Sequence, residues 1–190
     1  MAHIFRTRMI DPAKVTNFKR TEFELQEFLL FATLVAGKDA LQQSEKLAEF
    51  SAHVEQPLFF GIANLSDSKL LRLLKIVKTG QYSRLMRCWR QLSMGRLNLS
   101  NCAVTDLENV FGIGPKTARY FLLHSRPGQR FAVLDTHILK WIHATLGLKT
   151  PSKTPHSKRK YALIECAFLE YCDKSGLQPH ELDLNIWNRR

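Results

Sequence analysis

Two residues of this chain, Lys116 and Asp135, have types and settings that could support covalent chemistry. Lys116 directly follows Pro115, and proline favours the first position of a helix, so the lysine should lie near the positive end of a helix. This dipole and partial burial should lower the pKa of its amine and free it to act as a nucleophile. Asp135 precedes a predicted helix over residues 136–146, whose first N–H groups would hold the carboxylate in its ionised form. A fixed carboxylate of this kind stabilises positive charge on a reacting group.

Each of these residues also has a purely structural interpretation. Lys116 could bind a phosphate group without reacting, and Asp135 could be a helix cap and nothing more. The carboxylate of Asp135 would favour the ammonium form of Lys116, and so it would oppose the effects of burial and of the helix dipole. The sequence leaves open which of these effects is larger.

The segment before Lys116 predicts a pair of short helices. Thr105 and Glu108 have the spacing of a capping box, so a first helix should begin at Thr105 and run to about residue 111. Gly112-Ile113-Gly114 interrupts it, and Pro115 begins the second helix. The glycines allow the backbone to come close to a large ligand, and the new helix offers unpaired N–H groups there. Such a helix start binds phosphate.

The sequence GIGPKTA resembles the helix-hairpin-helix motif, which grips the DNA backbone without reading its sequence. Lys116 and Asp135, separated by a loop with Arg126-Pro127-Gly128, resemble the catalytic pair of the endonuclease III superfamily of DNA glycosylases. The resemblance covers residues 23–187 and is specific over residues 107–141. It implies that Lys116 and Asp135 are catalytic. It also implies DNA binding by the hairpin residues Gly112, Ile113, Gly114, Pro115 and Thr117.

This resemblance implies a particular reaction. Cleavage of an N-glycosidic bond develops positive charge on the sugar, which Asp135 would stabilise. Lys116 would attack C1′, form a Schiff base and cleave the strand by β-elimination, so the chain would be a DNA glycosylase with AP lyase activity. Two alternatives remain open. Asp135 could activate water in a monofunctional glycosylase, or the protein could be a non-catalytic module that clamps DNA.

The end of the chain bears on which base is removed. HELDLNIW (residues 180–187) resembles the end of a small, cluster-free class of archaeal-type 8-oxoguanine DNA glycosylases, so a damaged purine, 8-oxoguanine, is the expected base. That class usually continues to a terminal lysine that touches the base and has DRH where this chain has DTH, whereas this sequence ends at Arg190. A different modified base therefore remains an alternative. Trp141, Trp187 and Phe121 are candidate stacking surfaces or core residues.

The same resemblance assigns roles to two turns. A glycosylase rotates its base out of the stack, and a side chain fills the gap. Gly80-Gln81-Tyr82 resembles the turn that carries this wedge, which makes Gln81 the candidate, with the loop near residues 34–38 on the opposite side of the DNA cleft. Both segments could instead be ordinary surface turns. The backbone carbonyls of Glu108, Val110 and Ile113 would hold a monovalent cation, Na⁺ or K⁺.

The cysteines do not have the spacing of a metal cluster. Some relatives of endonuclease III carry a C-terminal iron–sulfur cluster held by four close cysteines, but here only Cys166 and Cys172 are near each other. We expect no iron–sulfur cluster and no required cofactor. The four cysteines are predicted to be reduced and mostly buried, with Cys166 on the apolar side of its helix. They are Cys88, Cys102, Cys166 and Cys172.

Charge and hydropathy favour a DNA partner. The formal net charge of +11 indicates a polyanion, and double-stranded DNA with a damaged base is the first candidate, with an acidic membrane surface as the alternative. The chain has no apolar run of about 18 residues to span a bilayer, and its start lacks the pattern of a signal peptide. We expect a monomer in the cytoplasm, or wherever the cell keeps its DNA.

Apolar periodicity predicts an all-α fold. Helices are expected over residues 21–35, 38–50, 67–78, 81–93, 136–146, 161–172 and 180–187, and only residues 130–134 resemble a strand. Residues 1–20 should form a partly ordered arm. The family resemblance implies one domain, residues 1–190, made of two helical lobes with the DNA cleft between them. Residues 38–130 would form the middle lobe, and residues 1–37 with 131–190 the other.

Overall fold

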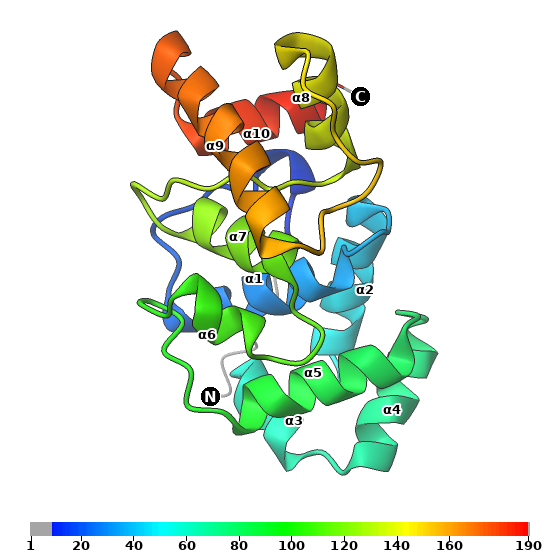
Figure 1. The fold of residues 1–190 in the computed structure, drawn as a ribbon. Helices are drawn as coiled ribbons and strands as arrows, with labels where there is room; N and C mark the ends of the chain where they lie inside the picture. The colour runs from blue at the N-terminus through cyan, green and yellow to red at the C-terminus, as the bar shows by residue number, and fades with distance from the viewer. Residues whose placement is uncertain (1–8, 190) are drawn as a thin grey trace. The chain divides into compact units, whose positions relative to one another are not determined.

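The computed structural model describes residues 9–189, and within them it contains helices and no strand. The all-α prediction is confirmed, whereas residues 1–8 of the expected N-terminal arm lie outside the described residues. The helices, drawn in Figure 1, are η1 (Pro12–Lys14), α1 (Glu22–Leu34), α2 (Ala40–Ser51), α3 (Leu58–Asn64), α4 (Asp67–Ile76), α5 (Tyr82–Met94), α6 (Val104–Glu108), α7 (Pro115–Ser125), α8 (Thr136–Leu146), α9 (Lys158–Ser175) and α10 (Pro179–Asn188). No helix in this part of the chain is both long and apolar enough to cross a membrane.

The chain divides into two compact units. The first contains Met1–Val15 and Lys19–Gly114, and the second contains Thr16–Phe18 and Pro115–Arg190. This division differs from the expected lobes, because α1 belongs with the middle helices and the boundary falls inside the predicted hairpin. The reason lies in α1, which buries nearly every residue from Leu25 to Leu34 and packs against α2, α3 and α5. A helix that is apolar all round becomes the centre of a unit.

The core of the first unit is fixed by one buried polar contact as well as by apolar packing. Trp89 of α5 is fully buried, and its indole N–H donates to Thr33 Oγ1 of α1 at 2.9 Å. The ring of Phe50 from α2 meets Trp89 edge-on, with centroids 4.9 Å apart. A buried indole N–H needs such a partner, so this bond sets the rotation of α5 against α1.

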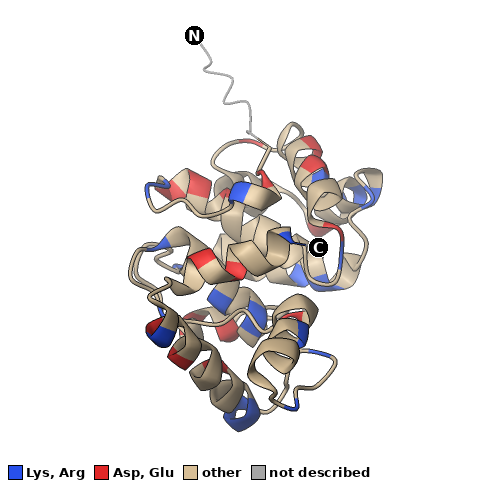
Figure 2. Ribbon diagram, turned by 90° about the horizontal axis from the view of Figure 1, so that it is seen from above, with Lys and Arg blue, Asp and Glu red and all other residues tan. Residues whose placement is uncertain are grey.

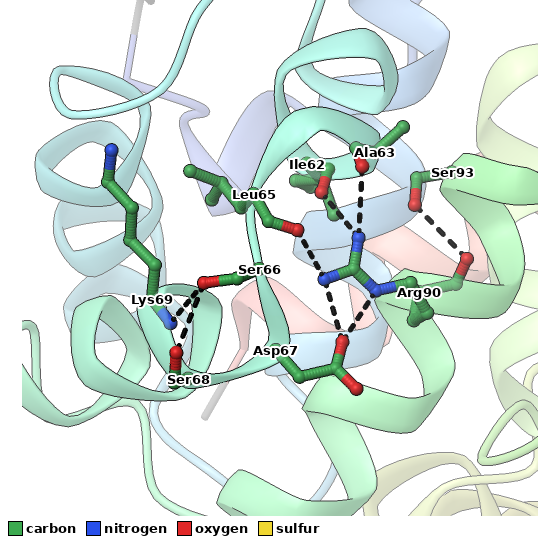
Figure 3. A network of polar contacts seen from close by, with 9 residues as sticks. All are labelled: Ile62, Ala63, Leu65, Ser66, Asp67, Ser68, Lys69, Arg90 and Ser93. Carbon is green, nitrogen blue, oxygen red and sulfur yellow. Dashed lines mark hydrogen bonds and ion pairs between the residues drawn. The ribbon is translucent and has the colours of Figure 1, made fainter.

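Arg90 of α5 joins the end of α3 to the start of α4 (Figure 3). Its guanidinium donates to the carbonyls of Ile62 at 2.8 Å, Ala63 at 3.3 Å and Leu65 at 2.8 Å. Its Nε also donates to Asp67 Oδ1 at 3.0 Å. The carbonyls at a helix end lack intrahelical partners and carry partial negative charge, so a planar cation with several N–H groups satisfies them together.

The core of the second unit lies between α8, α9 and α10. Helix α10 packs against α7, α8 and α9, and Figure 1 shows it beside α8 and α9. The buried residues of this core are Ala132, Leu134, Ile138, Leu139, Ile142, Tyr161, Ile164, Phe168, Cys172 and Leu182.

The prediction for Cys166 in α9 is wrong. Cys166 is exposed rather than buried, and its neighbour Leu163 is 65% exposed. The buried stripe runs through Tyr161, Ile164 and Phe168, at helical spacing. Cys166 lies two residues beyond Ile164, about 200° around the helix, and so faces solvent. The other three cysteines are buried, as expected.

The start of α6 also differs from the prediction. The helix begins at Val104 and ends at Glu108, and its cap is Ala103 rather than Thr105. Asp106 Oδ2 accepts a hydrogen bond from the Ala103 N–H at 2.7 Å, which is the acidic half of a capping box. The predicted Thr105–Glu108 capping box is therefore wrong, because the carboxylate of Asp106, two residues before Glu108, already caps the helix start. The segment that follows, as far as Gly114, is a turn.

Candidate active site

Lys116 is the second residue of α7 and is partly buried. Burial lowers the pKa of its amine, and the charges of Asp135 and Asp183 oppose this by raising it. Burial is the larger effect, so the net shift is downward. The opposing effects that the sequence leaves unresolved therefore combine to lower the pKa of Lys116, which makes its neutral form more accessible than that of a free lysine. All three residues belong to the second unit.

Asp135 caps α8, as predicted. Its Oδ1 accepts hydrogen bonds from the N–H groups of His137 at 2.8 Å and Ile138 at 2.9 Å. These two bonds use one carboxylate oxygen and fix the orientation of the side chain, while Oδ2 takes no part in the cap. The site therefore contains a carboxylate whose direction is set by the backbone.

The segment before Asp135 is extended but forms no strand, so the strand suggested for residues 130–134 is wrong. Side chains from α9 take the place of a partner strand. The Tyr161 hydroxyl donates to the Ala132 carbonyl at 2.7 Å and accepts from the Leu134 N–H at 3.2 Å. Glu165 Oε1 accepts from the Ala132 N–H at 2.9 Å. Burial raises the pKa of Tyr161, so its hydroxyl stays protonated and keeps donating. These contacts place Asp135 at the start of α8.

Asp183 is a site residue that the sequence reasoning missed. It is 4% exposed, and its Oδ2 lies 3.1 Å from Nε2 of His124, which is completely buried. His124 Nδ1 in turn shares a hydrogen bond of 2.8 Å with Thr16 Oγ1. The other carboxylate oxygen, Oδ1, is buried and has no hydrogen-bond partner among the described residues. Burial raises the pKa of Asp183, although His124 and Lys116 lower it.

Lys116, Asp135 and Asp183 lie in different environments within the second unit. Lys116 interacts electrostatically with both Asp135 and Asp183. Asp135 is partly exposed and is held by backbone N–H groups. Asp183 is buried and is hydrogen-bonded to His124 of α7. Two carboxylates in different environments can take different roles, because the buried one accepts a proton more readily. The arrangement can supply an amine nucleophile, a fixed negative charge and a nearby proton acceptor.

The two glycines of the predicted hairpin, Gly112 and Gly114, have different surroundings. Gly112 has a φ of +83°, a conformation that favours glycine, and a Cβ there would lie 3.1 Å from Cγ of Arg84. A Cβ at Gly114 would meet no described atom within 4 Å. Only Gly114 therefore keeps a surface open for close approach of a ligand. Ile113 and Thr117 are buried, so they would offer DNA their backbone rather than their side chains.

Gln81 lies in an exposed turn with left-handed backbone, at a φ of +48°. Its side-chain amide donates to the Ala36 carbonyl at 3.5 Å, and its Oε1 accepts from Arg84 Nε at 2.5 Å. Ala36 belongs to the loop of residues 34–38, so this loop lies beside Gln81 within the first unit and not across a DNA cleft from it, as the sequence resemblance implied. Lys38 of this loop also donates to the Thr79 carbonyl, next to the Gln81 turn.

The carbonyls proposed for a monovalent cation lie in the first unit. The Val110 carbonyl accepts a hydrogen bond from the Ile113 N–H at 3.1 Å, within the turn after α6. A carbonyl oxygen has two lone pairs, so this bond leaves one lone pair of the Val110 oxygen for another partner. Side chains offer no comparable site, because residues 9–189 contain no group of three His, Cys, Asp or Glu placed to hold a metal.

The aromatic candidates belong mainly to the core. Phe121 is completely buried. Trp141 meets Phe168 and Tyr171 edge-on, with ring centroids 6.0 Å and 5.0 Å apart, and it packs against the core of the second unit. Trp187 is partly buried. Phe121 therefore has no free face for a stacked base.

No family model matches the chain. The 8-oxoguanine DNA glycosylase/AP lyase of Thermoplasma volcanium is 37% identical over 81 residues, and that of Thermoplasma acidophilum is 38% identical over 81 residues. In both cases the match covers 43% of this chain and 37% of the relative. The chain thus spans little more than a third of the length of the curated relatives it matches.

Solved structures match over nearly the whole chain. The 8-oxoguanine glycosylase/lyase of Methanocaldococcus jannaschii, in complex with DNA containing 8-oxoguanine, has a TM-score of 0.71 at 24% identity. It covers 96% of this chain and 87% of its own. The 8-oxoguanine DNA glycosylase of Thermotoga maritima has a TM-score of 0.70 at 23% identity, covering 94% and 85%. This chain therefore has the helical fold of these glycosylases.

Proposed function

We propose that this chain is a base-excision DNA repair glycosylase with AP lyase activity, and that it removes a damaged purine, 8-oxoguanine first among them. One observation carries the proposal: Lys116 is an amine whose pKa is lowered by burial, in the same unit as a backbone-oriented carboxylate, Asp135. This is the pair that cleavage of a glycosidic bond requires. The matched relatives and solved structures, which are 8-oxoguanine glycosylases, support the choice of base.

The proposed reaction uses these groups in turn. The neutral amine of Lys116 forms a bond to C1′ of the damaged nucleotide while the bond from C1′ to the base breaks, and the base leaves with the electron pair and takes up a proton. Asp135 stabilises the positive charge that develops on the sugar. Opening of the sugar ring gives a Schiff base to Lys116. Removal of a proton from C2′ then expels the 3′ phosphate by β-elimination.

Asp183 has a supporting part in this scheme. A lysine that begins as ammonium must lose a proton before it attacks, and the buried carboxylate of Asp183 is a ready acceptor because burial raises its pKa. Its Oδ1 has no partner among the described residues, so it can take this proton without breaking its bond to His124.

The partner proposed for this reaction is double-stranded DNA that contains the damaged base. The net charge of +11 supports a polyanionic partner. Lys and Arg occur on several helices and loops and are interspersed with acidic residues (Figure 2). Binding through backbone phosphates would therefore depend steeply on salt and little on sequence. The protein would act as a monomer, where the cell keeps its DNA.

A monovalent cation at the predicted hairpin belongs to the same proposal. The carbonyls of Glu108, Val110 and Ile113 would hold Na⁺ or K⁺, which would add positive charge for a DNA phosphate. The reaction itself needs no cofactor, because the lysine supplies the nucleophile.

Borohydride trapping on DNA with an abasic site or with 8-oxoguanine tests the proposal. Borohydride reduces a Schiff base to a stable covalent adduct, so the parent should give an adduct on both substrates, and Lys116→Gln should give none. Base release without any adduct would replace the lysine mechanism by water activation through Asp135. Neither base release nor an adduct would leave only a passive DNA clamp. A panel of other modified bases identifies the substrate if 8-oxoguanine is not released.

A further inference from the structure

One face of α5 holds the turn between α6 and the predicted second hairpin helix. Gln91 Oε1 accepts from the Phe111 N–H at 2.8 Å, and its side-chain amide donates to the Asn109 carbonyl at 3.3 Å. The guanidinium of Arg87 lies 3.9 Å from the centroid of the Phe111 ring. Arg84, Arg87 and Gln91 are spaced by one turn and by two turns of helix, so they share this face. All these residues belong to the first unit.

Arg84 extends this contact beyond the turn. Its Nη1 donates to the Gly112 carbonyl at 3.0 Å, and its Nη2 donates to the Thr33 carbonyl in the last turn of α1 at 2.7 Å. Its Nε donates to Gln81 Oε1 at 2.5 Å. One rigid, planar group thus binds three chain segments through its three nitrogens. A lysine has a single nitrogen and cannot hold three acceptors in a fixed arrangement.

Gly112 packs tightly against the side chain of Arg84. A Cβ at Gly112 would lie 3.1 Å from Arg84 Cγ, which is tighter than ordinary contact. The aliphatic part of Arg84 therefore fills the space beside the glycine while its guanidinium holds the carbonyl. Both the distance and the direction of the Gly112 turn relative to α5 are fixed.

We propose that Arg84 is a positioning residue that sets the Gln81 turn and the Gly112 turn at a fixed separation. The proposal rests on the proposed function and on the roles that the sequence resemblance implies, in which Gln81 fills the gap left by the extruded base and the hairpin grips the backbone. Extrusion of a base requires that the DNA backbone be held while the wedge enters, so the two turns must act on the same stretch of DNA. Misplacement of one relative to the other by about 1 Å would cost about 10²-fold in rate.

Arg90 provides a matched control on the same helix. It also uses its guanidinium to hold three carbonyls, those of Ile62, Ala63 and Leu65, and it lies nearly two turns further along α5 (Figure 3). It contacts neither the Gln81 turn nor the Gly112 turn. If Arg84 only stabilised the fold, its loss would resemble the loss of Arg90.

The test compares Arg84→Met with Arg90→Met. Methionine keeps much of the aliphatic packing and removes the hydrogen bonds. We would measure thermal unfolding, release of 8-oxoguanine from duplex DNA, and the fluorescence of 2-aminopurine next to the lesion, which rises when the base is extruded. Strand cleavage at an abasic site inside an unpaired bubble, which needs no extrusion, completes the set.

Arg84→Met should lose about 10²-fold in base release and most of the fluorescence rise, yet it should cleave the abasic bubble within a few-fold of the parent. Arg90→Met should unfold at a lower temperature and, once folded, keep both activities. Equal losses of base release in folded Arg84→Met and Arg90→Met, or equal losses on duplex and bubble, would overturn the positioning role. A parent that releases no base and forms no adduct would overturn the proposed function instead, and the role of Arg84 with it.

Discussion

Replacement of Asp135 by asparagine separates catalysis from folding, because the two roles of this residue use different properties. The capping role uses one oxygen, since Oδ1 accepts from the N–H groups of His137 at 2.8 Å and Ile138 at 2.9 Å. Asparagine keeps an oxygen at that position and is as good a cap as aspartate, so the loss of folding free energy should stay below about 1 kcal/mol. The proposed catalytic role uses the negative charge, which asparagine lacks.

The loss of charge has a larger effect than the change of cap. Removal of one preorganised electrostatic group commonly costs about 10²–10³ in rate, or about 3–4 kcal/mol of transition-state stabilisation. Base release by Asp135→Asn should therefore fall by about this factor. Cleavage at preformed abasic sites should suffer less, because Asp135 raises the pKa of Lys116 and its removal leaves more of the amine neutral.

The assay measures single-turnover release of 8-oxoguanine, strand cleavage at an abasic site, DNA affinity and thermal unfolding for each variant. Asp39→Asn is the matched control, since Asp39 caps α2 through a bond of 2.9 Å from the Gln42 N–H. It should show the same small change in stability and unchanged base release. The reasoning about charge is refuted if Asp135→Asn releases bases at the rate of the parent on every substrate that the parent accepts.

Three further predictions concern Asp183 and the two glycines of the predicted hairpin. Asp183→Asn should lower the pKa of Lys116, because it removes a negative charge that raises this pKa. The acid limb of the pH profile for strand cleavage should therefore move to lower pH. An unchanged pH profile would contradict the electrostatic effect of Asp183 on Lys116. Burial raises the pKa of Asp183 above the ordinary aspartate value of about 4. Ionisation of this carboxyl therefore costs folding free energy as the pH rises above that value. Urea unfolding at a series of pH values should show the parent losing stability relative to Asp183→Asn. Gly114→Ala should weaken DNA binding with little change in stability, because its Cβ meets no described atom. Gly112→Ala should lose about 1 kcal/mol or more of folding free energy, because Gly112 has a φ of +83° and its Cβ would press on Arg84. The opposite pattern in filter binding and thermal unfolding would show that Gly114 is not the point of close approach.

Local hydrogen bonding explains what could be read from the sequence. An N-cap is decided within a few residues, so Asp135 before a run of apolar residues identified the start of α8, and Pro115 identified the start of α7. The same rule failed at Thr105, because two carboxylates, those of Asp106 and Glu108, lie within this short helix. Asp106 bonds the Ala103 N–H, and the helix therefore begins earlier than predicted. Helical periodicity gave the all-α fold for the same reason, since it depends on neighbours three and four residues away.

Tertiary packing decided the rest. The bond between His124 and Asp183 joins residues 59 apart in the chain, and that between Thr16 and His124 joins residues 108 apart. No local pattern marks such pairs, because they depend on which faces of α7 and α10 meet. Arg84 likewise is one basic residue among many in the sequence, and only the approach of α1 and the Gly112 turn to α5 gives it its two distant acceptors, the carbonyls of Thr33 and Gly112. The amino-acid sequence thus determined the chemical groups and the helices that carry them, whereas the packing of those helices determined the burial of Lys116 and the charges near it, and so the direction in which its pKa shifts.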